Sequence, residues 1–155
     1  MTQRLTWLQG LHAMRDGMLE QLDDVDLTFS PGGDNPSFGL LLEEMAALQQ
    51  SYLASLNSDA HQWPSTDLPR QGRHSTSRIR ERFQTLDAQM ESAVSTLSRD
   101  DDLDAKVTRP DGTVRTRDEQ VEIYTQAMFI FLGKAVVYLR AMDKALPLSV
   151  ERYIG

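Results

Sequence analysis

The sequence predicts an all-α protein, a four-helix bundle with a short β-hairpin before the last helix. Three observations lead to this prediction. Apolar residues recur at spacings of three and four in four separate segments, residues that favour helix N-caps precede several of these segments, and Pro and Gly residues mark the connections. A length of 155 residues fits a single domain, residues 1–155, built around one core.

Three of the helices are defined mainly by their apolar stripes. We expect them at about residues 3–22, 35–56 and 75–99. Asn35 or Ser37 can cap the second of them by accepting hydrogen bonds from free amide groups. The residues of the three stripes are Trp7, Leu11, Met14, Met18 and Leu22; Phe38, Leu41, Leu42, Met45, Leu48, Tyr52, Leu53 and Leu56; and Ile79, Phe83, Leu86, Met90, Ala93 and Leu97.

Three further segments lack a helical period. Residues 57–74 contain two prolines and a glycine, and the length of this segment makes it a candidate to cover a site or an interface. The acidic run 100–104 does not match a calcium-binding loop, and we expect it to end one element and lie in a surface turn. Residues 107–115 carry an Asp-Gly turn signal between β-branched residues, which favours a short hairpin.

The fourth helix has the clearest start. Residues 116–119, Thr-Arg-Asp-Glu, form a capping box, and the helix should continue to about Asp143 because Pro147 prevents much further extension. Within it, residues 127–139 are apolar on nearly all sides, and Lys134 is their only charge. One face of a monomeric bundle cannot cover such a helix, so we expect a homodimer, since two-fold dimers are the commonest soluble oligomers.

Composition excludes several classes of protein. The chain is 40% apolar and 25% charged, which is ordinary for a soluble globular domain, and it has no cysteine, which removes disulfides and thiolate metal sites. The net charge of −7 disfavours binding to nucleic acid or to an anionic membrane. The apolar stretch 127–139 is shorter than the roughly 20 residues of a membrane span. We therefore expect a cytoplasmic protein without nucleic-acid or membrane partners.

The order of these segments resembles that of the DinB-like, damage-inducible four-helix bundles. Residues 131–147 resemble the last helix of that family, which typically reads His-His-Arg-Gly-Gln followed by Tyr-Leu-Arg-Ala and a nearby proline. Residues 35–45 resemble the opening of its second helix, and Pro-Asp-Gly at 110–112 precedes the last helix as it often does in the family. The resemblance implies an up-down-down-up bundle, commonly dimeric and associated with damage or stress responses.

The resemblance also implies where a metal would lie. Metal-bearing members hold zinc or nickel with one histidine on the second helix and two on the last, and they include thiol-dependent S-transferases and hydrolase-like enzymes. The matching positions in this sequence are Glu44, Ala127 and Phe131. An alanine methyl group and a phenyl ring cannot ligate a metal, so the usual cofactor is not expected here.

Two alternatives at this site follow from nearby polar residues. His12 and Tyr124 could join Glu44 in one pocket and rebuild a metal site, or they could be ordinary boundary and hydrogen-bonding residues. Lys134 stands where the family has glutamine, and it either pairs with Glu43 or Glu44 or extends its amine to water. These residues, together with Ala127 and Phe131, are the pocket candidates.

Other titratable residues give weaker signals. Arg73 and Arg78 lie in a locally basic stretch at the start of the third helix, where an anion could bind, although a solvated helix face explains the same residues. His61 and His74 have no partners at ligand spacing, and both are expected to be exposed.

Two functions follow from these residues. The first is a metal-free, dimeric module that binds an apolar or mixed small ligand between its helices or mediates an interaction. The alternative is a metal-dependent thiol S-transferase or hydrolase-like enzyme with a rebuilt site. The sequence does not identify a ligand, a substrate or catalytic residues.

Overall fold

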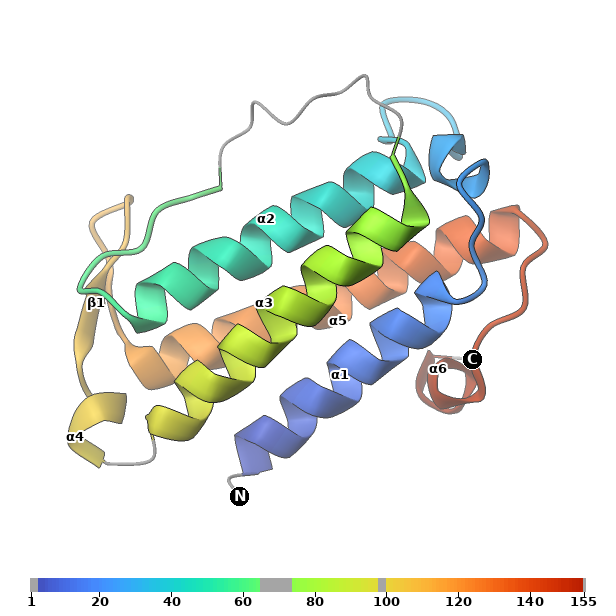
Figure 1. Ribbon diagram of the computed structural model, residues 1–155. Coiled ribbons are helices and arrows are strands. Elements are labelled where there is room, and N and C mark those ends of the chain that lie inside the picture. The colour runs from blue at the N-terminus through green and yellow to red at the C-terminus, as the bar shows by residue number, and fades with distance from the viewer. Residues whose placement is uncertain (1–2, 65–73, 98–99, 155) are drawn as a thin grey trace.

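The computed structural model describes residues 3–64, 74–97 and 100–154. Its four long helices are α1 (Gln3–Leu19), α2 (Phe38–Leu56), α3 (Thr76–Thr96) and α5 (Arg117–Ala141). In Figure 1, α1 and α5 run in one direction while α2 and α3 run in the other. The predicted four-helix bundle with up-down-down-up topology is therefore confirmed.

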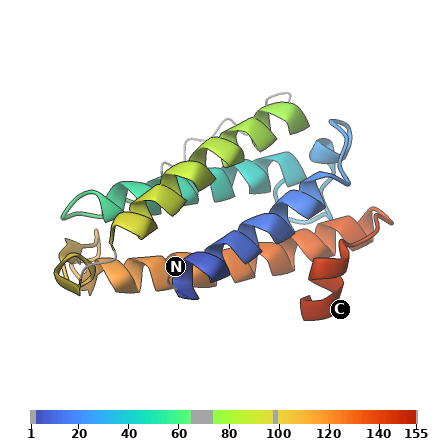
Figure 2. The same cartoon turned by 60° about the horizontal axis from the view of Figure 1, so that its bottom comes forward.

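Each long helix packs on two neighbours. Helix α1 lies against α3 and α5, and α2 lies against the same two helices, so that α1 and α2 occupy opposite corners of the bundle (Figure 2). The apolar stripes meet in one core, in which Leu8, Phe83, Met128 and Leu132 have no exposed surface. Trp7 was predicted to belong to the stripe of the first helix, but it lies outside this core and is 45% exposed. The end of α2 and the start of α3 lie at opposite ends of the bundle, because these two helices point the same way.

Side-chain caps fix the starts of α2 and α5. The Ser37 hydroxyl accepts a hydrogen bond from the Leu40 amide at 3.2 Å. At α5 the Thr116 hydroxyl accepts from the Glu119 amide at 3.0 Å, and the Glu119 carboxylate accepts from the Thr116 amide at 2.7 Å. The predicted capping box is therefore present, and the hydrogen bond from the Thr116 amide lowers the pKa of Glu119.

The predicted hairpin is also confirmed. Strands β1 (Lys106–Thr108) and β2 (Val114–Thr116) pair antiparallel, and Gly112 adopts a φ of 80° in the turn, a conformation that glycine reaches without strain. Residues that follow α2 also bond to this hairpin, since the His61 amide donates to the Thr108 carbonyl at 2.8 Å. Residues 59–61 and the hairpin thus close one end of the bundle.

Several elements differ from the expectation. Helix α1 ends at Leu19 and not at residue 22, and three short helices were not predicted: η1 (Asp26–Thr28), α4 (Asp100–Leu103) and α6 (Leu148–Ile154). They are too short for a clear period in the sequence. Helix α6 is held by tertiary contact, because Val150 is fully buried in the core.

Helix α5 occupies one corner of the bundle, between α1 and α2, and its apolar surface is not fully covered. By length and composition alone it could cross a membrane, a test that the core helix of a soluble protein also passes, and 44% of its most apolar window is buried inside the bundle. Phe129, Ile130 and Val137 are 40%, 63% and 57% exposed. The expectation of a dimer rested on residues 127–139 being apolar on nearly all sides, and these three are the large apolar side chains among them that are exposed.

Candidate functional site

A pocket of about 280 Å³ lies between α2 and α5. It contains four of the residues selected from the sequence, Glu44, Ala127, Phe131 and Lys134, which come together because α2 and α5 run antiparallel side by side. The charged side chains of Glu44 and Lys134 are exposed, and the rest of the wall is apolar. The remaining lining residues are Leu41, Met45, Leu48, Pro64 and Ile130.

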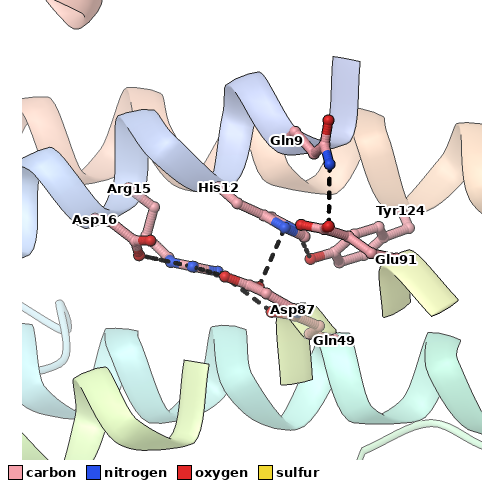
Figure 3. A network of polar contacts seen from close by, with 8 residues as sticks. All are labelled: Gln9, His12, Arg15, Asp16, Gln49, Asp87, Glu91 and Tyr124. Atoms are coloured by element: carbon pink, nitrogen blue, oxygen red, sulfur yellow. Dashed lines mark hydrogen bonds and ion pairs between the residues drawn. The ribbon is translucent and has the colours of Figure 1, made fainter. Parts of the chain in front are cut away.

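His12 and Tyr124 do not line this pocket. Both are buried in the centre of the bundle, where His12 Nε2 lies 3.0 Å from the Tyr124 hydroxyl (Figure 3). The expectation that they share a pocket with Glu44 is therefore wrong. The physical reason is that their stripes on α1 and α5 point toward the bundle axis, whereas Glu44 projects from the outer side of α2.

The two residues belong to a buried polar network that connects all four long helices (Figure 3). Arg15 on α1 has no exposed surface, and its guanidinium donates to both carboxylate oxygens of Asp87 on α3, at 3.1 and 2.5 Å. Gln49 on α2 donates to the same carboxylate at 2.8 Å. The ring of Phe83 lies under the Arg15 guanidinium at 4.0 Å. A buried charge is thus paired, hydrogen-bonded and packed.

Burial sets the protonation of this network. It lowers the pKa of His12 even though Nδ1 lies 3.2 Å from an Asp87 oxygen, a contact without hydrogen-bond geometry. It raises the pKa of Tyr124. Burial alone would lower the pKa of Arg15, but the hydrogen bonds and charge of Asp87 and Asp16 hold it above its ordinary value. At neutral pH the network therefore contains a neutral imidazole and a neutral phenol beside a guanidinium that pairs with both Asp87 and Asp16.

This network serves the packing of the helices and not the binding of a ligand. The α2–α5 pocket and three further pockets among the described residues are lined by other side chains, and not by His12, Arg15, Gln49 or Tyr124. Buried polar groups of this kind specify which helices meet and in which register, because a shifted packing would leave them unpaired. We assign the network to the architecture of the bundle.

A sequence profile of the DinB superfamily matches residues 8–126, more than three quarters of the chain. The chain belongs to the DinB superfamily. Two solved structures from Bacillus subtilis share its fold. YfiT, described as a probable metal-dependent hydrolase with an unusual four-helix bundle topology, has a TM-score of 0.74 and 15% identity, with 92% of this chain and 89% of YfiT covered. The DinB-like protein YjoA has a TM-score of 0.75 and 13% identity, with 96% and 98% covered.

These identities are low enough that the two structures establish the fold alone. No curated protein sequence matches the chain. The activity of this DinB-superfamily protein therefore has to be argued from its own residues.

The residues of this DinB-like pocket do not fit a catalytic metal. Of the three positions that the resemblance assigns to ligands, Glu44 alone offers a donor, while Ala127 and Phe131 add apolar surface. The described residues contain no group of three or more His, Asp or Glu side chains that could hold a metal ion. His12 and Tyr124 cannot complete the set, since they bond to each other in the core.

Three buried members of the network were missed in the sequence, although a signal was present. Asp87 stands one turn from Phe83, inside the buried stripe of α3, and Arg15 and Gln49 occupy equivalent places in the stripes of α1 and α2. A charged residue on a buried stripe needs a partner of opposite charge. Arg15 and Asp87 could have been matched on that ground.

Both loop histidines of the DinB-like chain were expected to be exposed, and this was wrong. His61 is 2% exposed because it packs between the rings of Tyr52 and Trp63, at centroid distances of 4.7 and 4.9 Å, and burial lowers its pKa. His74 is half-buried against Gly39 at the start of α2. Aromatic and backbone packing, rather than metal ligation, accounts for both residues.

The anion site predicted at Arg73 and Arg78 lies at the start of α3. Arg73 lies outside the described residues, and Arg78 is exposed on α3. The first amide of α3, from Thr76, donates to the Asp24 carboxylate at 2.7 Å, and the Thr76 hydroxyl donates to the same oxygen at 2.9 Å. The hydrogen bond from this amide lowers the pKa of Asp24. A carboxylate of the chain itself thus binds at this helix start.

Proposed function

We propose that this DinB-superfamily protein is a metal-free, homodimeric module that binds an apolar or mixed small molecule in the pocket between α2 and α5. The observation that carries the proposal is the replacement of the two last-helix ligand positions by Ala127 and Phe131, which leaves a pocket of about 280 Å³ with mostly apolar walls. Apolar walls with a few polar groups are typical of small-molecule sites, and bundle helices commonly form them. A cytoplasmic role in a damage or stress response is part of the same proposal.

Fluorescence of N-phenyl-1-naphthylamine, a neutral apolar dye, tests ligand binding. We expect saturable enhancement on titration, and we expect Ala127→Phe to abolish it by filling the pocket. Gln126→Phe is the matched control, because residue 126 is exposed on the same helix and does not line the pocket. Binding that survives in Ala127→Phe, or no binding to the wild-type protein, contradicts the proposal.

The alternative is a metal-dependent thiol S-transferase or hydrolase-like enzyme, in line with the description of YfiT as a probable metal-dependent hydrolase. The observation that favours this alternative is Glu44, whose carboxylate is the side chain of the pocket that could ligate a metal. Metal analysis of untagged protein separates the two functions. Stoichiometric zinc or nickel that is lost in Glu44→Ala would replace our proposal by this one.

The dimer is proposed to form through the outer face of α1, α5 and α6. Trp7, Phe129 and Tyr153 are 45%, 40% and 63% exposed there and line one shallow groove of about 500 Å³. Covering these aromatic side chains would remove apolar surface from water. Sedimentation equilibrium should give twice the chain mass of 17.5 kDa, and Phe129→Glu should give the monomer. A wild-type monomer at micromolar concentration contradicts this part of the proposal.

A further inference from the structure

The pocket between α2 and α5 carries opposite charges on its two walls. Lys134 projects from α5 and Glu44 from α2, and both side chains are exposed. Among the described residues, neither has an ion-pair partner within 4.0 Å. The neighbouring Glu43 differs, because its carboxylate pairs with Arg82. Within the part of the chain that the structure describes, no other charged side chain pairs with the two charges that face the pocket.

Both charges of the pocket lie toward one end, beside Leu41, and the opposite end is apolar. Ala127 and Lys134 are seven residues apart, which is about 10 Å along a helix axis. Because α2 is antiparallel to α5, Leu48 lies toward the Ala127 end and Glu44 toward the Lys134 end. Pro64 adds to the apolar wall. A ligand with an apolar body and one polar end matches this gradient.

The positive charge of Lys134 indicates that the polar end of the ligand is an anion. It is the only charged residue of the stretch 127–139, and its long stem lets the ammonium group reach over the pocket with three hydrogen-bond donors. The shorter Glu44 can accept a hydrogen bond from a neighbouring N–H or O–H group of the same ligand. In a chain of net charge −7, a free anion is otherwise repelled, so its binding should depend on Lys134.

We propose that the ligand of this pocket is an amphipathic small molecule whose carboxylate or sulfonate pairs with Lys134, while an adjacent hydrogen-bond donor meets Glu44 and the apolar body lies between Leu48 and Ala127. This inference rests on the proposed function and adds the chemical class of the ligand. A second protein chain fits less well, because a pocket of about 280 Å³ matches a molecule of two or three rings.

A pair of dyes isolates the anionic group. 1-Anilinonaphthalene-8-sulfonate and N-phenyl-1-naphthylamine share the same rings and N–H group and differ by one sulfonate. We expect the sulfonate dye to bind the wild-type protein more tightly by about five-fold, the size of a partly exposed ion pair, and to displace the neutral dye competitively. Lys134→Met should remove this advantage, and the readout is the ratio of the two affinities, because the substitution alters the pocket wall that both dyes contact.

Two variants control for general charge effects. Arg140→Met removes an exposed cation from the same helix outside the pocket, and it should leave the dye ratio unchanged. Glu44→Gln removes the repulsion of the anion but keeps a hydrogen-bond acceptor, and it should strengthen binding of the sulfonate dye.

The outcomes separate this inference from the proposed function. If the neutral dye binds but Lys134→Met does not change the ratio of affinities, the anionic class is wrong and the small-molecule function stands. If Arg140→Met lowers the ratio as much as Lys134→Met, net charge explains the preference and the inference is again wrong. If neither dye binds the wild-type protein, both proposals fail.

Discussion

Replacing Asp87 by asparagine keeps the shape of the side chain and removes its charge from the buried network. In the wild-type protein the carboxylate accepts two hydrogen bonds from Arg15 and one from Gln49. The Arg15 side chain has no exposed surface, so water cannot replace what is lost. The variant therefore leaves a buried cation with a neutral amide in place of its main partner.

The expected loss of stability follows from these contacts. Removing one member of a buried ion pair costs about 3–5 kcal/mol, and a single hydrogen bond to a charged group about 1.5–3 kcal/mol. The amide oxygen that Asp87→Asn introduces can still accept one bond, and Asp16 still pairs with Arg15 at 2.7 Å. We therefore expect the lower end, about 3 kcal/mol, which corresponds to a fall in Tm of about 6–12 °C for a domain of this size.

Urea unfolding followed by circular dichroism measures this loss as a change in the midpoint at constant m-value. The matched control is Asp16→Asn, because Asp16 bonds the same guanidinium from a side chain that is 46% exposed. It should cost less than about 1 kcal/mol. Equal effects of the two variants, or a loss below about 1 kcal/mol in Asp87→Asn, would refute the view that burial makes this pair important.

Three further predictions concern single positions. Gly39→Ala places a Cβ within 3.0 Å of the His74 Cγ and Cβ atoms and should lower the free energy of unfolding by about 1–3 kcal/mol. The control Gly133→Ala meets no atom within 4 Å and should raise it by about 0.5–1 kcal/mol, and similar shifts in both variants would contradict the contact. Burial lowers the pKa of His12 in the folded state below 6.5, so the unfolded chain binds the proton first and stability falls as the pH drops below 6.5. His12→Gln should therefore flatten the dependence of the unfolding free energy on pH between about pH 7 and pH 5, and identical profiles of the two proteins would contradict this prediction. Thr116→Ala removes the acceptor at the start of α5 and should cost about 1 kcal/mol in urea unfolding, and an unchanged midpoint would argue against the cap.

Local chemistry determined the helices and several of their ends. Capping residues predicted a start at Asn35 or Ser37, of which the structure uses Ser37, and a start at Thr116. The Asp-Gly pair predicted the turn at Gly112. Each of these features depends on neighbours within four residues. The order of the segments was enough to indicate the family and the positions of Glu44 and Ala127 in one pocket. These features need little information from distant parts of the chain.

Only the tertiary structure decided which polar residues are buried together. Arg15 on α1 and Asp87 on α3 are separated by 72 residues, and their pairing follows from a topology that places α1 beside α3. The same packing buried His12 and Tyr124 in the core and His61 against aromatic rings. The sequence had left two alternatives for His12 and Tyr124 and had predicted that His61 is exposed. Burial depends on every element packed around a side chain, so a local pattern can place a residue on a helix face but cannot say what meets that face.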